Sequence, residues 1–396
     1  MQRLSACISI CLLTCALATP LRAEPQPSVA AVNTNIPGAL RLRLPPTLYA
    51  VVGLETNLYF DNVCLTLNPA NWGFDIQCPI GKQQAERWTA VASAKDVGQH
   101  PFVLEVRNDQ NELVARAESQ LVVVSADRAT DKPLSLLMVG DSLTHGSVYP
   151  QRVWELCQTP GNPKLQLVGS HGLQSPLGDI RHEGYGGWTA QRFATHFTPT
   201  ARTGDYKLRG SPFLYEQADG SKKLDFAKYC QDVNEGRCPD AVTIFLGPND
   251  IFSYDDLRIE AGIDTMLTHY DQLVNMIHAH DSKVRVGVML PVPPAASQDA
   301  FGSNYTTGQT RWQYKRNQHR LVERMLDHYA GKESEQVFLV PTVVNLDCVR
   351  NYPEEVTELN LHAEQGRRQN NGVHPAASGY RQIGDSLYAW LKATTE

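Results

Sequence analysis

Residues 140–146 read Gly-Asp-Ser-Leu-Thr-His-Gly, and this stretch indicates how the second half of the chain folds. The apolar run at 134–139 comes directly before it and is typical of a buried parallel strand. Residues 149–154, Tyr-Pro-Gln-Arg-Val-Trp, follow it and can open a helix. A serine in such a strand-to-helix turn, here Ser142, is presented at the carboxyl edge of a sheet beside a helix N-terminus. Gly, Asp, Ser and Thr also suit a plain turn or helix cap, so the motif alone leaves both interpretations open.

The composition is that of an ordinary globular protein. The 396 residues are 42% hydrophobic and 20% charged, with a formal net charge of −6. A chain of this length favours two domains. The sequence has no basic stripe of the kind that binds nucleic acid, so we expect no nucleic-acid partner. It gives no indication of the oligomeric state.

The N-terminus has the pattern of a secretory signal. Arg3 precedes an apolar run at 4–18, and small residues allow cleavage after Ala18 or Ala23. The run is too short for a good membrane span, so we expect no stable membrane insertion. The sequence therefore predicts export to the periplasm or the extracellular space.

Composition and periodicity divide the chain into five parts. We expect a signal peptide at 1–23 and a flexible leader, rich in Pro, Ala and Asn, at 24–35. Short β-type runs between turn residues predict a small β-sandwich of immunoglobulin-like type at 36–125, followed by a polar linker at 126–133. From 134 to 396, apolar strand patterns alternate with helical patterns, which predicts a doubly wound parallel α/β sheet.

Three further segments follow predicted strands or precede the last helix, and would therefore lie near Ser142. Gly187 belongs to a glycine-rich segment, 182–189, where the backbone can approach a ligand closely. Asn249 directly follows the third strand and can aim an amide at a developing oxyanion. His374 precedes the final helix and can take and return a proton. Each has a bland alternative as a turn, cap or loop residue, but their joint occurrence in this order favours a shared site.

These blocks resemble the SGNH, or GDSL-type, hydrolase family over about residues 134–396, and more weakly its carbohydrate acetyl esterases. The resemblance implies a flavodoxin-like sheet, no metal or cofactor, and hydrolysis of esters through an acyl-serine. It assigns Ser142 as nucleophile and His374 as base. The backbone N–H groups of Ser142 and Gly187 and the side chain of Asn249 become the oxyanion donors.

One position departs from the family pattern. The family usually has Asp three residues before the histidine, and this chain has Asn371. Replacing that Asp by Asn in a serine protease triad costs about 10⁴ in rate. Either the Asn371 amide oxygen or a main-chain carbonyl could orient His374, which would give a modified triad or a Ser-His dyad. A carboxylate from elsewhere remains open as well.

Six cysteines remain after the predicted cleavage. In an exported chain an even number suggests disulfides, and the closest pairs in sequence are Cys64–Cys78 and Cys230–Cys238. Buried free thiols are the alternative. Cys157 and Cys348 are left without an assigned partner, and the cysteine spacings do not resemble a zinc site.

Several features favour an acylated small molecule or polysaccharide as the substrate. Export, an added β-domain and aromatic loop residues favour short acyl esters, above all acetyl, on carbohydrate; candidate substrate contacts are Trp188, Phe252 and Tyr305. Half of such aromatics are expected to be core residues. A lipid or lysophospholipid acyl-ester hydrolase is the enzymatic alternative, although the only candidate lid is short. A catalytically impaired glycan-binding protein is the alternative from another class.

Overall fold

The computed structural model describes residues 40–175, 178–199, 205–305, 309–362 and 364–396. The predicted signal peptide and leader lie outside these residues. The chain from Leu40 to Glu396 forms one compact unit. The domain boundaries at 36–125 and 134–396 therefore stay a prediction.

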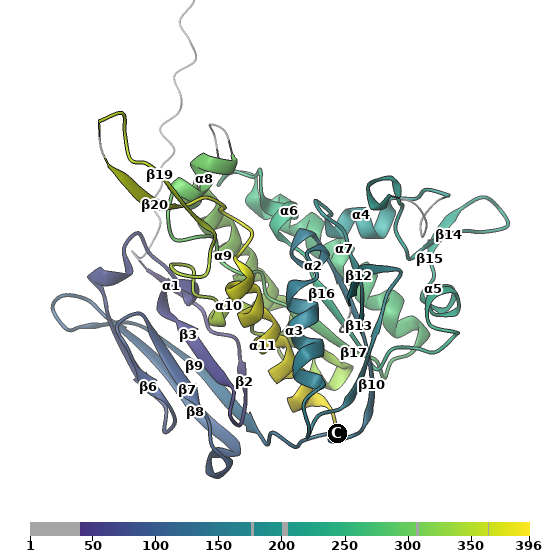
Figure 1. The fold of residues 1–396 in the computed structure, drawn as a ribbon, viewed down its shortest axis with the longest axis horizontal. Helices are drawn as coiled ribbons and strands as arrows, with labels where there is room; N and C mark the ends of the chain where they lie inside the picture. The colour runs from purple at the N-terminus through teal and green to yellow at the C-terminus, as the bar shows by residue number, and fades with distance from the viewer. Residues whose placement is uncertain (1–39, 176–177, 200–204, 306–308, 363) are drawn as a thin grey trace, which may run out of the picture. The chain divides into compact units, whose positions relative to one another are not determined.

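A mixed, mainly parallel sheet forms the centre of the larger part of the chain (Figure 1). Strand β10 pairs in parallel with β11, β13 and β16, and β17 and β18 extend the sheet beyond β16, while β12 is antiparallel to β13. Strand β13 follows β11 along the same side of β10; without it, the strands β11, β10, β16, β17 and β18 run second, first, third, fourth, fifth in chain order. This is the flavodoxin-like order, so the predicted fold class is confirmed. The strand bounds are β10 (Pro133–Gly140), β11 (Lys164–Val168), β12 (His171–Ser175), β13 (Gly178–Gly184), β16 (Ala241–Phe245), β17 (Arg285–Met289) and β18 (Val337–Val340).

Helices cover both faces of this sheet. Side chains alternate along β10, so Leu137 and Val139 pack with the core residues of α7 and α9. Leu136 and Met138 point to the other face and pack with those of α3 and α11. The helix bounds are α3 (Val148–Cys157), α7 (Ile259–His280), α9 (Arg311–Tyr329) and α11 (Ala377–Thr394).

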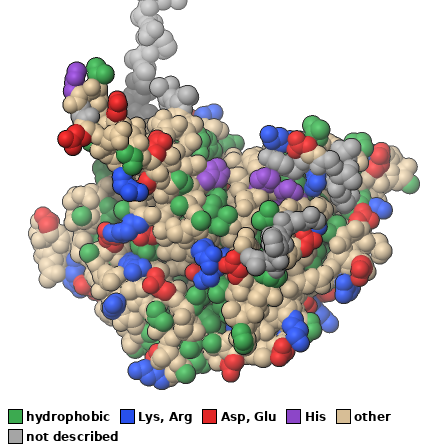
Figure 2. Space-filling view, viewed as in Figure 1, with side chains coloured by type: hydrophobic (Ala, Val, Ile, Leu, Met, Phe, Trp, Pro, Cys, Tyr) green, Lys and Arg blue, Asp and Glu red, His purple; other side chains and the backbone are tan. Residues whose placement is uncertain are grey.

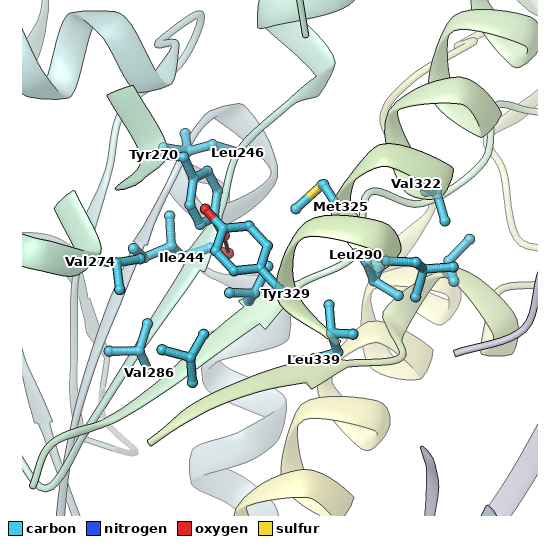
Figure 3. Packing of buried hydrophobic residues seen from close by; sticks show 14 of the residues in the cluster. Ile244, Leu246, Tyr270, Val274, Val286, Leu290, Val322, Met325, Tyr329 and Leu339 are labelled. Atoms are coloured by element: carbon cyan, nitrogen blue, oxygen red, sulfur yellow. Dashed lines mark hydrogen bonds between the residues drawn. The ribbon is translucent and has the colours of Figure 1, made fainter. Parts of the chain in front are cut away.

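Figure 3 shows the packing on the α7 and α9 face. The rings of Tyr270 from α7 and Tyr329 from α9 lie 5.6 Å apart over the sheet. The Tyr270 hydroxyl donates a hydrogen bond of 2.6 Å to the carbonyl of Ile244 in β16. Its polar end is therefore satisfied inside an apolar core, as a buried tyrosine requires.

The preceding region forms two antiparallel-rich sheets, of four and three strands. Trp88 from one sheet contacts Phe102 from the other edge-on, with ring centroids 5.1 Å apart, so the two sheets pack face to face as predicted. The four-stranded sheet contains β2 (Thr47–Val51), β9 (Leu113–Val124), β8 (Gly98–Arg107) and β5 (Gly73–Gln77). The three-stranded sheet contains β3 (Glu55–Tyr59), β7 (Arg87–Val91) and β6 (Lys82–Gln83).

The remaining elements are short. One pair of strands, β1 (Arg41–Leu42) and β4 (Cys64–Leu65), flanks the sandwich. Two hairpins are β14 (Leu214–Glu216) with β15 (Lys222–Leu224) and β19 (Glu354–Glu358) with β20 (Gln365–Gln369). The short helices are α1 (Phe60–Val63), α2 (Ser142–His145), α4 (Ala190–Thr195), α5 (Phe226–Val233), α6 (Pro248–Ile251), α8 (Asp299–Asn304) and α10 (Thr342–Asn345). Searching the described segments finds no helix long and apolar enough to cross a membrane.

Polar contacts join the β-sandwich region to the helices of the larger part. Asp61 in α1 forms ion pairs with Arg311 and with Lys315, both in α9. Asn57 in β3 donates through its backbone and side chain to Asn345 in α10, each at 3.0 Å. The β-sandwich therefore packs against α9 and α10 and not only against the linker.

Neither predicted disulfide is present in the structure. All six cysteines in the described part of the chain are free thiols. The buried Cys64 thiol lies in the field of Asp61 and Lys315, and burial raises its pKa to about 12. Cys78 instead accepts a hydrogen bond from the backbone of Ile80. Cys230 and Cys238 do lie close together, but their sulfurs are not bonded to each other.

Candidate active site

Ser142 is the first residue of α2, immediately after β10. Asp141 caps this helix, because its Oδ1 accepts a hydrogen bond of 2.9 Å from the backbone of Leu143. The turn requires glycine before it: a Cβ on Gly140 would lie 2.0 Å from Thr144 Oγ1. The motif therefore folds as the sequence predicts, with the serine at the carboxyl edge of the sheet.

His374 lies against Ser142. Its Nε2 is 2.8 Å from Ser142 Oγ, although the two residues are 232 positions apart. The histidine is half-buried, and burial lowers its pKa below the ordinary 6.5. The ring is therefore neutral at pH 7 and can accept the hydroxyl proton.

Asn371 does not hold the histidine ring in the predicted way. Its Oδ1 accepts the backbone N–H groups of Val373 at 3.1 Å and of His374 at 2.9 Å. Within the described segments no hydrogen bond is formed by His374 Nδ1, so the expected acceptor, side chain or main chain, is missing. The prediction for Asn371 is wrong because an Asx turn competes for its oxygen. Asn371 shapes the loop that carries His374.

Asn249 is hydrogen-bonded to a neighbour of Ser142 and to a neighbour of Gly187, the two predicted backbone donors of the oxyanion hole. Its Nδ2 donates to Asp141 Oδ2 at 3.1 Å and to the carbonyl of Trp188 at 3.2 Å. Asp141 precedes Ser142 and Trp188 follows Gly187, so all three predicted oxyanion donors lie in one neighbourhood. Gly187 has φ +76°, a left-handed conformation that favours glycine. Its N–H donates no hydrogen bond to any described residue.

Two buried carboxyl groups beside the serine were not singled out from the sequence. Burial raises the pKa of Asp141 to about 7 and that of Asp250 to about 8. Asp250 Oδ1 accepts the backbone N–H of Ala190 at 3.0 Å, which ties α6 to α4. Asp141 sits in the quoted motif and Asp250 directly follows Asn249, but only the packing around them shows that burial disfavours their charged forms.

A group of histidines adjoins the turn after Ser142. His145 Nδ1 lies 2.9 Å from His171 Nε2, and Ser147 Oγ lies 2.8 Å from His182 Nε2. Burial lowers the pKa of His171 to about 4 and that of His182 to about 3. Figure 2 shows histidine side chains gathered near the upper centre of this face. Because the His171 and His182 rings are neutral at pH 7, they add no positive charge beside the serine.

The three predicted aromatic contacts fall in two classes. Trp188 is only 1% exposed and packs against Tyr185 and Phe193, so it cannot stack on a substrate and this prediction is wrong. Phe252 and Tyr305 are half-buried, with ring centroids 4.9 Å apart, and they pack against the cluster that contains Val373. Sequence reasoning could not separate them, since aromatic loops serve cores and binding surfaces equally.

No group of three potential metal ligands occurs at this site among the described residues. A doubly wound sheet with a serine–histidine contact at its carboxyl edge is an arrangement typical of hydrolases. The GDSL-like Lipase/Acylhydrolase family matches residues 138–382, more than half of the chain. The chain therefore belongs to the GDSL-like lipase/acylhydrolase family, and it is a carboxylic-ester hydrolase.

Similar solved structures are distant. A carbohydrate acetylesterase family member from Sinorhizobium meliloti is 15% identical, over 65% of this chain and 97% of that one, with a TM-score of 0.36. The acetyl xylan esterase AlAXEase is 13% identical over 65% and 100%, with a TM-score of 0.33. A possible lipase from Chitinophaga pinensis DSM 2588 is 14% identical over 65% and 97%, with a TM-score of 0.34. No curated protein sequence matches the chain. None of these likenesses bears on the substrate.

Proposed function

We propose that this protein is an exported serine esterase that removes short acyl groups, above all acetyl, from carbohydrate. The observation that carries the proposal is the contact of 2.8 Å between Ser142 Oγ and His374 Nε2 at the carboxyl edge of the sheet. Family membership supplies the reaction class, and the predicted signal at 1–23 supports export.

Ser142 acts as the nucleophile and His374 as the base. Oγ attacks the ester carbonyl carbon while its proton passes to His374 Nε2. The backbone N–H groups of Ser142 and Gly187 stabilise the oxyanion, and the amide of Asn249 joins them by exchanging one of its two present acceptors, Asp141 Oδ2 or the Trp188 carbonyl, for the oxyanion. His374 then returns the proton to the leaving alcohol oxygen, and a water molecule, activated in the same way, releases the acid from Ser142.

A Ser-His dyad fits the contacts of the ring better than a triad does. The shift in the His374 pKa has burial as its cause, and no carboxylate contributes to it. A water molecule can then accept the hydrogen bond of Nδ1–H, which keeps its proton throughout, because the ring is only half-buried. A dyad of this kind stabilises the imidazolium less than a carboxylate would.

The half-exposed pair of Phe252 and Tyr305 favours a sugar. Aromatic faces beside a polar catalytic loop suit the apolar face of a pyranose ring with its hydroxyl groups at the rim. A long acyl chain would instead need a continuous apolar channel beside the serine.

Substrate panels test the proposal directly. We expect turnover of an aryl acetate, a fall in kcat/KM with lengthening acyl chains, and release of acetate from acetylated polysaccharides. Ser142→Ala should abolish all of these with the fold intact by circular dichroism. Faster cleavage of lysophospholipid than of any acetylated glycan would establish the lipid alternative. Glycan binding without turnover of any ester would establish the binding alternative.

A further inference from the structure

Three soft ligand groups meet at a place remote from Ser142. Cys230 lies in α5, Cys238 lies in the loop before β16, and His280 is the last residue of α7. One sulfur from each cysteine and one ring nitrogen of the histidine all lie within 4.8 Å of one another. Cys230 is buried, Cys238 is half-buried and His280 is exposed, so the group opens to solvent on one side.

The three ligand atoms are close enough together for one tetrahedral metal ion to bind all of them after small side-chain movements. Zinc lies about 2.3 Å from thiolate sulfur and about 2.0–2.1 Å from imidazole nitrogen. Ligands on a tetrahedron of that size are therefore roughly 3.5–3.8 Å apart. A disulfide would need the sulfurs at about 2.05 Å, whereas both thiols are free in the structure.

We propose that Cys230, Cys238 and His280 bind one Zn²⁺ ion, with water at the fourth position. Two thiolates with an imidazole form a donor set that zinc prefers over harder cations. The ring of His280 also packs edge-on against Phe226, with centroids 6.1 Å apart, and this contact holds it beside α5. The sequence did not reveal the site because His280 is far from both cysteines along the chain.

The place of the site makes its role structural. Cys238 precedes β16, whereas Asn249 follows it, so the cluster lies at the amino edge of the sheet and the serine at the carboxyl edge. Helix α7 spans 22 residues between those edges, which is about 33 Å. The ion would fasten the end of α5 and the following loop to the end of α7.

Zinc titration of the reduced, metal-free protein tests the site. We expect one equivalent to bind, a rise in Tm on binding, and the absorption of thiolate-bound Co²⁺ when cobalt replaces zinc. Cys238→Ser and His280→Gln should each weaken binding by roughly tenfold or more. Cys78→Ser and His269→Gln remove a half-buried cysteine and a half-buried α7 histidine outside the cluster, and should leave binding unchanged.

The esterase activity provides an independent readout, because hydrolysis of an aryl acetate should stay unchanged when zinc is removed below the melting temperature. Absence of saturable zinc binding would overturn the proposal. Equal loss in the control variants would overturn it as well. So would a Cys230–Cys238 disulfide, found by peptide mapping of unreduced protein purified from its native compartment.

Discussion

At the residue scale, Asn371 acts on the histidine through the backbone. Its Oδ1 accepts hydrogen bonds from two N–H groups of the loop, and a carboxylate oxygen can accept the same two bonds. We therefore expect Asn371→Asp to retain or raise kcat. Asn371→Ala loses both bonds, each contributing about 0.5–1.5 kcal/mol. We expect its kcat to fall by about tenfold, with Tm measured alongside to separate unfolding from misplacement. A loss of turnover in Asn371→Asp with an unchanged Tm would contradict this account.

The pH profile reports on His374. The base must be neutral to accept the Ser142 proton, and burial lowers its pKa below 6.5. We therefore expect kcat/KM to be lost as pH falls through a value below 6.5, and to be flat from there to neutral pH. A limb centred clearly above 6.5 would mean that an undescribed carboxylate stabilises the imidazolium.

Asn249 combines two tasks. Asn249→Ala should lower kcat by about 10²–10³, the usual loss for one oxyanion donor. It also removes the hydrogen bonds to Asp141 and to the Trp188 carbonyl, so the turn itself loosens. The KM for an aryl acetate should change much less than kcat, because the lost donor acts on charge that develops in the transition state. An unchanged kcat would exclude this role.

At the element scale, the strand-turn-helix unit from β10 to α2 depends on Gly140. A Cβ there would meet Thr144 Oγ1 at 2.0 Å and the carbonyl of Phe245 at 3.0 Å. Gly140→Ala should therefore lower Tm by several degrees and reduce turnover, since the turn and β16 cannot both keep their places. Gly302→Ala in α8 is the matched control, because open space surrounds its Cβ position. Equal Tm values for the two variants would exclude the steric explanation.

The sequence predicted those elements whose signal is local. The apolar run before Ser142 describes one strand, and each helical pattern between the predicted strands describes one helix face. Order along a parallel sheet then brings His374 to Ser142. What the sequence could not provide was the partner of each polar atom: the Asn371 oxygen had several acceptable donors, and only the folded loop selects among them.

The cysteines show the same dependence on the folded chain. Cys230 and Cys238 are close in sequence, and the fold does bring them together, but it adds His280 from the far end of α7. The burial of Trp188 was equally hidden. Nothing in the sequence around a tryptophan in a glycine-rich loop tells whether its side chain lies in the core or on the surface. Both features come from tertiary packing that no spacing encodes.

At the scale of the whole molecule, the β-sandwich is fastened to α9 by a partly buried charge group. Lys315 has only 3% of its side chain exposed, and Asp61 of α1 is its ion-pair partner. Burial lowers the pKa of Lys315, while Asp61 acts in the opposite direction. Arg311 joins the same carboxylate and also donates from Nε to the carbonyl of Ala295 at 3.0 Å. The N–H of Ala295 in turn donates to the carbonyl of Gly372, two residues before His374. Arg311 therefore connects Asp61 of the sandwich region to a segment that contacts the His374 loop.

Removing one partner should cost more than the pair itself contributes. Asp61→Ala leaves the Lys315 charge buried and uncompensated, and we expect a loss of about 3 kcal/mol in unfolding free energy, at the low end for buried pairs because Asp61 is 29% exposed. Asp327→Ala is the matched control: its partner Arg43 also comes from the sandwich region, but both side chains are exposed, so the expected loss is about 1 kcal/mol or less. Asp61→Ala with Lys315→Met should recover part of the stability, since the deeply buried Lys315 charge is then gone and only the less buried Arg311 still lacks the carboxylate. Urea unfolding of the four proteins measures these differences, and an Asp61→Ala loss no larger than that of Asp327→Ala would show that the buried pair does not fasten the sandwich to α9.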